Sequence, residues 1–598
     1  MRSRAFRTFA VCSILCAIVV AIYYPATRGP SVFDSKRFEE STHGRVVDGI
    51  NLPDLPDSGS RYFLYWSHDV SSFIFGNEVL TQKWAGIVVH CLTAIMIFFL
   101  LRLIFFTAYK RGLPSEYYAA FGAFLFAVCP AALYSTVYVV QRSIQLATLF
   151  SILSVMSYIK AVNLNKIHYR IPLYFLSAYM YFCAAHSKEH IVMLPVVIIA
   201  AMILYRDRLK NKSILIESGV LVAVCLPFLW RLYLGHSAYV MTAIEYHARQ
   251  TLELFRDKSG VDIVETYWIH SAIAQCKFFF YYLRDWVVAW PQWTSIDLKP
   301  VITDGRFTFS DFAWVGAFFA YPLVCLWLLL GRGLRSIAGF CLSVPWIMFW
   351  TEPTTARIAE QFVLYRSYAW MWPLYGVIPY VAQVVGAKRK HIIPVGIAIA
   401  LSFTAVTAYK ARLFSTRAGV WHDAVVALPE DKTWGGWHTL NSYCSALLQD
   451  KRASEAIPYC EMARESNPKY ANAWHNEAVA YLSIREWDKS KYALEQTIKH
   501  GQEKDVYYST YGILLGSQGL HDEALEKYDE AIKHRADNAP ANYNSAIIYT
   551  NRREYGKALD RAKVLLGNRA IRGRVKTLIK GIEDRQRAYS KTKEGEVR

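Results

Sequence analysis

Seven acidic residues occupy residues 29–69, between the first two apolar runs of a chain whose formal net charge is +19. A carboxylate beside a hydroxyl can take its proton while the oxygen attacks an electrophile, which is the role of a general base. Asp34 is the first candidate for this role, with Asp48 and Asp69 behind it. On position alone an acid just outside an apolar helix is more often solvated surface, so the assignment needs further support.

Isolated cations form a second group of chemically capable residues. A lone positive charge at the end of an apolar helix is costly unless a partner or ligand compensates it. Lys188 has an internal alternative in neutralisation by Glu189, and snorkelling to the interface is the alternative for Arg366. Convergence on one anion, such as a phosphate, would explain the group as a whole. The candidate phosphate-binding residues are Gln141, Arg142, Lys188, Glu189, Arg284, Glu360, Arg366 and Tyr368.

Apolar runs long enough to cross a bilayer must position these residues. The chain is 54% hydrophobic, and the surplus is concentrated in runs of roughly 17 to 25 residues. The first run lacks a clear cleavage site, so it is interpreted as an uncleaved anchor. About eleven spans are predicted, near residues 6–24, 84–106, 117–137, 143–161, 171–187, 190–205, 214–231, 311–331, 336–350, 366–386 and 391–409.

Basic residues cluster in alternate loops, which predicts the orientation of the chain. Arg2, Arg4 and Arg7 precede the first span, and such residues are retained on the cytoplasmic side. The N-terminus is therefore expected in the cytoplasm, with residues 29–69 and everything after Phe414 on the opposite side. The positive charge is explained by orientation, which argues against nucleic-acid binding.

Residues 235–311 form a longer outer segment that resists assignment as a span. Its apolar stretch 278–286 is interrupted by Arg284 and Asp285 and followed by Pro291. An amphipathic or re-entrant helix lying against the outer membrane face is predicted, because broken backbone needs cover by protein or a wet cavity.

The polar tail carries an internal repeat. Leu440, Trp474, Tyr508 and Asn542 are spaced by 34 residues (474 − 440 = 34, and likewise onward). Small residues recur at fixed offsets where paired helices would touch, which is the tetratricopeptide pattern. About four repeats would form a stable stack with a concave face for extended peptide. We expect Trp474, Tyr481 and Tyr508 to help bind an acceptor there.

Cys444 and Cys460 are the only cysteines in this tail, since the other nine of the eleven lie in or beside apolar runs. They fall on the two helices of the first predicted repeat. A disulfide is one of two open alternatives, the other being two free thiols.

Several motifs recur along the membrane part of the chain: Phe33-Asp34, residues 84–101 with His90, residues 138–142 and 146–150, Ser187 to Glu189, Tyr282 to Arg284 and Glu360 to Tyr368. Together they resemble one enzyme class, the GT-C superfamily of polyprenyl-phosphate-dependent glycosyltransferases. More closely, the chain is similar to the transmembrane and tetratricopeptide-repeat protein O-mannosyltransferases and their bacterial relatives. Two departures are Ser35, where the family commonly has a second acid after the first, and Cys129 before Pro130, where it often has His.

The resemblance implies an all-α fold, a polytopic membrane GT-C domain at 1–414 followed by a periplasmic tetratricopeptide α-solenoid at 415–570. A capping helix and basic tail would occupy 571–598. It also implies a bacterial inner-membrane enzyme that moves a sugar from a polyprenyl-phosphate donor to Ser or Thr of an exported protein, such as a pilin, with inversion. A divalent cation is a possible cofactor, and no metal ligand is assigned.

Two other functions remain open at this point. One is an O-antigen ligase or glycan polymerase, which would also use lipid-linked glycans on the outer face but would carry a large late outer loop. The other is a non-enzymatic membrane scaffold whose repeats recruit partners.

Overall fold

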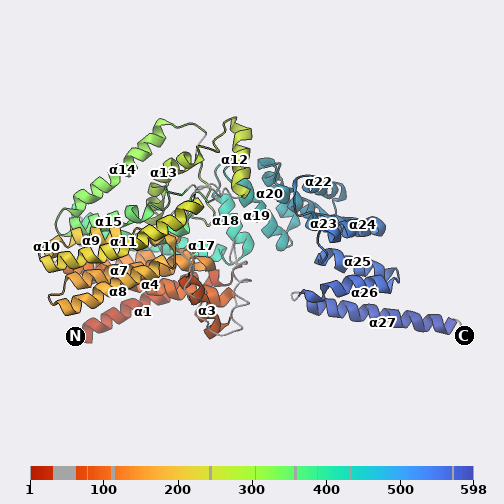
Figure 1. Ribbon diagram of the computed structural model, residues 1–598, viewed down its shortest axis with the longest axis horizontal. Helices are drawn as coiled ribbons and strands as arrows, with labels where there is room; N and C mark the ends of the chain where they lie inside the picture. The colour runs from red at the N-terminus through yellow and green to blue at the C-terminus, as the bar shows by residue number, and fades with distance from the viewer. Residues whose placement is uncertain are drawn as a thin grey trace. The chain divides into compact units, whose positions relative to one another are not determined.

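The chain folds into two helical units, Met1–Gly435 and Gly436–Arg598, in a computed structural model (Figure 1). The predicted all-helical class is confirmed, because the described residues contain no strand and only one isolated bridge, between Leu298 and Phe362. The structure describes residues 2–30, 62–76, 79–109, 115–240, 246–302, 305–355, 360–386, 388–430, 433–568 and 571–596.

Five helical segments of the described residues are long and apolar enough to cross a membrane. They lie in α1 (Arg2–Thr27), α4 (Val79–Ala108), α14 (Phe309–Leu329), α17 (Arg389–Leu413) and the segment Val139–Val162, most of which is α7 (Arg142–Val162). A sixth would be the pair α5 (Ser115–Ala127) and α6 (Pro130–Val137), bent by 59°. The bend falls at Pro130, which lacks a backbone N–H and so breaks the helical hydrogen bonding.

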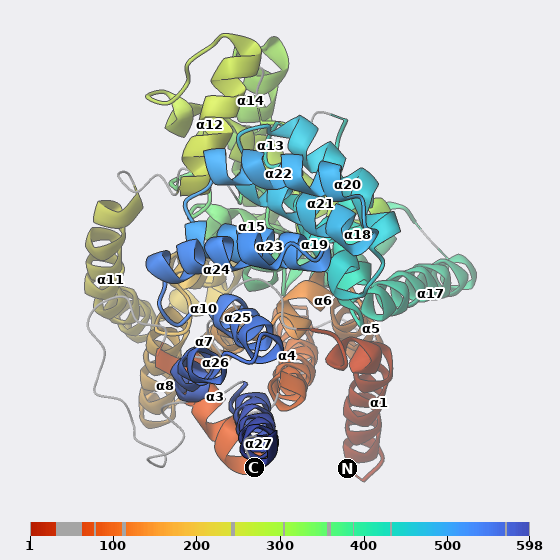
Figure 2. The ribbon, with the colours of Figure 1, turned by 90° about the vertical axis from the view of Figure 1, so that its right-hand side faces the viewer.

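Apolar side chains on the outside of the first unit fit a lipid environment. Only 22% of the apolar window of α14 and 11% of that of α17 are buried inside the protein, and Phe309 and Leu323 are 89% and 68% exposed. Figure 2 shows α14 beside α13 at one edge of this unit. In water such a surface would drive association, whereas lipid covers it at no cost. The structure thus supports a membrane protein.

The predicted number of about eleven spans is not confirmed. The run at 190–205 forms α9 (Leu194–Leu204), whose 11 residues are too few to cross a bilayer, and the run at 336–350 forms α15 (Leu334–Phe349), with 16. The run at 366–386 is not one helix at all. It breaks into the 3-10 helices η5 (Leu364–Ala369) and η6 (Leu374–Val377) and the short α16 (Ile378–Val384).

Residues 361–376, which we call the buried segment, are all buried within the first unit. Irregular backbone at membrane depth persists only where protein satisfies its polar groups. Tyr282 on α13 (Tyr267–Val287) bonds both the N–H and the carbonyl of Val363, and Trp286 donates to the Ser367 hydroxyl. Helix α13, predicted to lie against the membrane face, is instead packed onto this segment.

The second unit is a succession of helix pairs. The second helices begin at Ala453, Trp487, His521 and Tyr555, so the 34-residue period of the sequence is the period of the structure (487 − 453 = 34, and likewise onward). The predicted small residues lie at helix contacts: a Cβ on Gly512 would meet the Tyr528 ring at 2.4 Å. The helices are α19 (Gly436–Gln449), α20 (Ala453–Ser466), α21 (Ala471–Ser483), α22 (Trp487–His500), α23 (Lys504–Ser517), α24 (His521–His534), α25 (Ala539–Asn551), α26 (Tyr555–Val564) and α27 (Arg572–Glu596).

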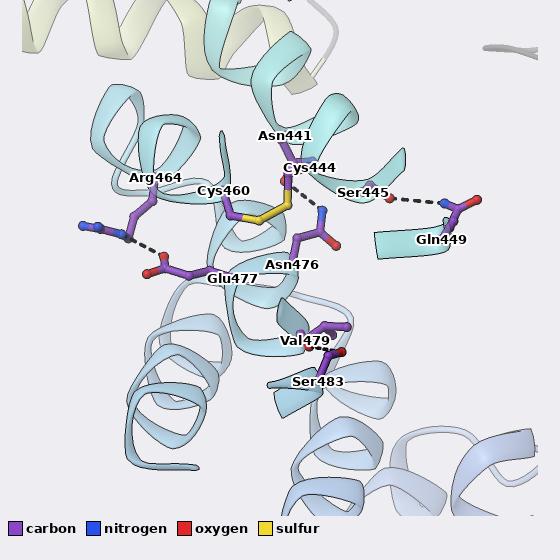
Figure 3. The surroundings of a disulfide bond; sticks show 10 residues. All are labelled: Asn441, Cys444, Ser445, Gln449, Cys460, Arg464, Asn476, Glu477, Val479 and Ser483. Carbon is purple, nitrogen blue, oxygen red and sulfur yellow. Dashed lines mark hydrogen bonds and ion pairs between the residues drawn. A yellow bond between two sulfur atoms is a disulfide. The ribbon is translucent and has the colours of Figure 1, made fainter. Parts of the chain in front are cut away.

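A disulfide joins Cys444 of α19 to Cys460 of α20 (Figure 3). Both cysteines are fully buried, and their Cα atoms are 5.3 Å apart, within the range that a disulfide spans. Arg464 and Glu477 form an ion pair at 2.8 Å beside it, between α20 and α21. The alternative that the sequence left open is therefore resolved in favour of the bridged form.

Helix α18 (Arg417–Val426) belongs to the first unit, although it follows the last apolar run. Asp423 on α18 forms an ion pair with Lys410, at the end of α17, and Lys410 also donates to the Thr294 carbonyl. These contacts tie residues after 414 to the first unit.

Candidate functional site

Of the three candidate carboxylates, the structure describes one. Asp34 and Asp48 lie outside the described residues. Asp69 lies on α3 (Tyr62–Phe75) and is half-buried. Two of its helix neighbours, Ser67 and Ser71, contact Arg142. Helix α3 thus brings the end of residues 29–69, which we call the acidic stretch, to one of the predicted phosphate-binding residues.

The point where the acidic stretch begins is held by Lys83, near the start of α4. Its ammonium donates to the carbonyls of Ala26, Gly29 and Pro30 at 3.2, 2.7 and 3.1 Å, which satisfies the C-terminal end of α1. Gly29 also packs directly on α17, because a Cβ there would meet the Phe414 carbonyl oxygen at 1.9 Å. The chain therefore leaves a three-helix junction four residues before Asp34 (34 − 30 = 4).

Arg142 is a buried cation surrounded by neutral acceptors. It is 1% exposed, and it donates to the Ser67 carbonyl, the Ser71 hydroxyl and both oxygens of Gln82 at 2.5 to 3.2 Å. In the part of the chain that the structure describes, its Nε has no hydrogen-bond partner, nor does the buried Oε1 of the neighbouring Gln141. Among the described residues no carboxylate pairs with Arg142. Within that part of the chain no acidic side chain neutralises its charge.

Lys188 and Arg366 come together from distant parts of the sequence in a group that we call the Glu352 cluster. Glu352, fully buried, lies 3.0 Å from His190 Nε2 and 3.3 Å from the Arg366 guanidinium. Arg366 also pairs with Glu360, and Lys188 Nζ lies 3.2 Å from Glu189. The members are Lys188, Glu189, His190, Glu352, Glu360 and Arg366.

Each cation of the Glu352 cluster has a carboxylate partner within the cluster, which favours the internal neutralisation that the sequence left open. Two cations face three carboxylates, and burial lowers the pKa of the intervening His190 to about 4, so the imidazole adds no positive charge near neutral pH. His190 and Glu352 were not predicted as site residues. Both lie in turns that the apolar pattern places on the outer side, so an ionisable residue in such a turn was the available signal.

Tyr368 and His90 form a buried pair that anchors the buried segment to α4. The Tyr368 hydroxyl lies 2.8 Å from His90 Nδ1, and the other ring nitrogen of His90 lies 3.0 Å from the Ala127 carbonyl. Both side chains are fully buried and fully bonded. This geometry suits a packing role for His90 and a positioning role for Tyr368.

Arg284 lies in a separate place, at the C-terminal end of α13. Its guanidinium stacks on the rings of Trp293 and Tyr281 at 4.0 and 4.6 Å and bonds Asp285 at 2.7 Å. It makes no ion pair or hydrogen bond with the Glu352 cluster. The predicted cations therefore lie in three different environments: Arg142 in one, Lys188 and Arg366 in the Glu352 cluster, and Arg284 in a third.

Asp285 is a candidate that the sequence analysis named only as an interruption. It is fully buried, and its Oδ2 has no hydrogen-bond partner among the described residues. Burial raises the pKa of Asp285 to about 7, although the neighbouring Arg284 opposes the shift. A carboxyl group that titrates near neutrality is a candidate for proton transfer. Helix α13 lies outside the candidate spans.

The predicted acceptor-binding aromatics are mostly inside the second unit. Trp474 and Tyr481 are 9% and 8% exposed, and Tyr481 donates to Glu461. Tyr508 is half-buried and stacks on His534. All three pack against helix neighbours, which leaves little of their rings available to a peptide.

No group of three or more His, Cys, Asp or Glu side chains is arranged to hold a metal ion within the part of the chain that the structure describes. Asp34 and Asp48 are not in that part, so the prediction of a divalent cation is not tested there.

Comparison with known proteins assigns the chain to no family. The chain matches no protein-family model, and a search of curated proteins finds no match to it.

Proposed function

We propose that the chain is a membrane glycosyltransferase of the GT-C type, which moves a sugar from a polyprenyl-phosphate donor to Ser or Thr of an exported protein. Asp34 is the leading candidate for the base, with Asp48 and Asp69 behind it. The proposal rests on the family resemblance of the motifs around residues 34, 142, 188, 284 and 366, and on the local geometry of those that the structure describes.

The observation that carries the proposal is the surroundings of Arg142. A buried guanidinium with only neutral partners is strongly destabilising unless an anion compensates it. A donor phosphate is the anion that an enzyme meets at the membrane, and its charge increases as the sugar leaves. A fixed cation then stabilises the leaving group more in the transition state than before it.

The acidic stretch supplies the other half of the chemistry. The junction of Lys83, Gly29 and Phe414 fixes the backbone just before Asp34, and α3 brings the other end of the stretch to Arg142. A base held beside the donor phosphate takes the acceptor proton as the hydroxyl attacks the anomeric carbon. Such a single displacement inverts the configuration of the sugar.

On this proposal the active site and the second unit lie in the periplasm. The Cys444–Cys460 bridge supports this location for the second unit, because disulfides persist in oxidising compartments and are rare in the cytosol. The second unit is, on this proposal, a tetratricopeptide array outside the cytoplasm that brings the acceptor protein to the enzyme.

Intact-mass measurement of exported proteins tests the proposal. Cells lacking the gene should lose a hexose or pentose mass increment on at least one protein, and the wild-type gene should restore it. Arg142→Gln should fail to restore it at equal membrane abundance. A proteome of envelope proteins without any sugar-mass difference would overturn the proposal.

The non-enzymatic scaffold is the second candidate, favoured by the internally paired ions of the Glu352 cluster. It predicts that Arg142→Gln and Asp34→Asn restore whatever the gene deletion removes. An O-antigen ligase would change the mass of a glycan or lipid instead of a protein, so the same measurement separates all three.

A further inference from the structure

A groove of about 470 Å³ lies between α25 and α27, at the C-terminal end of the second unit. Its volume is in the range of ligand-binding pockets. Helix α27 contributes residues 574, 577, 578, 581, 582 and 585, which share one helical face because they recur at three- and four-residue intervals. Helix α25 contributes the facing wall, including the exposed Ile547.

The charge of the groove is positive and uncompensated. Arg574 and Arg585 stand at its two ends, and none of its ten lining residues is acidic. Within the described residues neither guanidinium makes an ion pair or a hydrogen bond. The stretch between them is apolar at Leu578 and Ile582 and open at Gly581, where a Cβ would meet no atom within 4 Å.

We propose that this groove binds an extended acidic segment of a partner protein. A positively charged groove is complementary to a negatively charged partner. Its concave shape with an apolar floor fits a peptide better than a flat bilayer. The two arginines are 11 residues apart (585 − 574 = 11), which is roughly 16 Å along a helix. An extended chain covers that distance in about five residues.

The geometry therefore specifies a motif. Two acidic residues about five positions apart each pair with one arginine, and an apolar side chain between them lies over Gly581 against Leu578 and Ile582. The inference does not depend on transferase activity. It moves the expected peptide contact from the buried Trp474 and Tyr481 to the last helices of the unit.

Fluorescence polarisation with synthetic peptides tests it, using the full chain in detergent. The probe is fluorescein-labelled Gly-Asp-Ser-Leu-Ser-Ser-Asp-Gly, and the comparison peptide has the same composition with the two Asp adjacent. The double variant Arg574→Gln with Arg585→Gln should bind the probe about tenfold more weakly, as expected for losing two charge-assisted contacts. The adjacent-Asp peptide should bind the wild type at least about fivefold more weakly than the probe.

A matched control separates the groove from general electrostatics. Lys576 and Arg587 have the same spacing and charge, but they lie on the opposite face of α27 (587 − 576 = 11). The double variant Lys576→Gln with Arg587→Gln should bind the probe within about twofold of the wild type. Equal loss in the two double variants would overturn the proposal.

Filling the groove without changing its charge is the second control. Gly581→Leu should abolish probe binding and leave the helix intact, because glycine is a poor helix former and the new side chain enters open space. Gly573→Leu, also in open space but outside the groove, should bind normally. Normal binding by Gly581→Leu would overturn the proposal, as would binding to anionic vesicles that the Arg574 and Arg585 variant loses while no peptide binds.

Discussion

Replacing Asp285 by asparagine should stabilise the protein, and the gain should grow as the pH rises. The carboxyl group is fully buried, one of its oxygens has no hydrogen-bond partner among the described residues, and burial raises its pKa to about 7 from an ordinary value of 3.8. Asparagine keeps a carbonyl oxygen for Arg284 and removes the cost of ionising the group in the interior.

The pH dependence of the free energy of unfolding follows from the protons that the carboxyl group binds in the folded and unfolded states. Between about pH 4 and about pH 7 the folded carboxyl keeps its proton while the unfolded one has lost it, so wild-type stability falls over this range and levels off above it. From about pH 5 to about pH 8 the advantage of Asp285→Asn should increase by roughly 2.5 kcal/mol.

Denaturant unfolding of the full chain in detergent, followed by circular dichroism at several pH values, measures this advantage. Asp262→Asn is the control, because Asp262 is exposed and its side-chain oxygen still accepts the Val264 N–H. An advantage of Asp285→Asn that stays constant with pH would refute the reasoning.

Three further predictions concern other parts of the chain. Replacing Cys444 and Cys460 by serine should lower the unfolding free energy of the second unit by about 3 kcal/mol, measured by unfolding under non-reducing conditions, and an unchanged midpoint would contradict it. Glu352→Gln should destabilise the first unit by roughly 3 kcal/mol because it leaves Arg366 and His190 with one buried carboxylate fewer, seen as a lower thermal midpoint that Glu360→Gln, at the exposed edge, does not share. Lys83→Met should lower the transfer rate by about tenfold with donor binding retained, because Lys83 holds the chain before Asp34, and Lys83→Arg should recover part of it; loss of donor binding in both would contradict this positioning role.

Local pattern predicted much of the second unit. The recurrence of small residues every 34 positions reported which faces touch, and the helices begin at that spacing. The spacing of Cys444 and Cys460 placed them on paired helices, which is where the bridge forms. Neighbouring helices in such a stack contact each other in sequence order, so periodicity is enough to find the contacts.

The first unit was harder to predict because its contacts are distant in sequence. Residues 366–376 have the composition of a membrane span, yet they are buried by protein in irregular form, and hydropathy does not distinguish burial in protein from burial in lipid. Glu352 contacts Arg366 and also His190, from which it is separated by 162 residues (352 − 190 = 162). No periodic signal reports such a pairing. The isolated charge of Arg142 was visible in the sequence, whereas its neutral surroundings were not.

Reconstituted transfer tests the central claim most directly. The purified full chain in liposomes would be given a radiolabelled polyprenyl-phosphate hexose and an extract of exported proteins from cells lacking the gene. The account predicts that label moves to Ser or Thr of protein with the wild type, and that Arg142→Gln abolishes transfer while keeping the wild-type circular dichroism spectrum. Label that stays on the lipid with the folded wild type, or transfer that Arg142→Gln leaves intact, would contradict it.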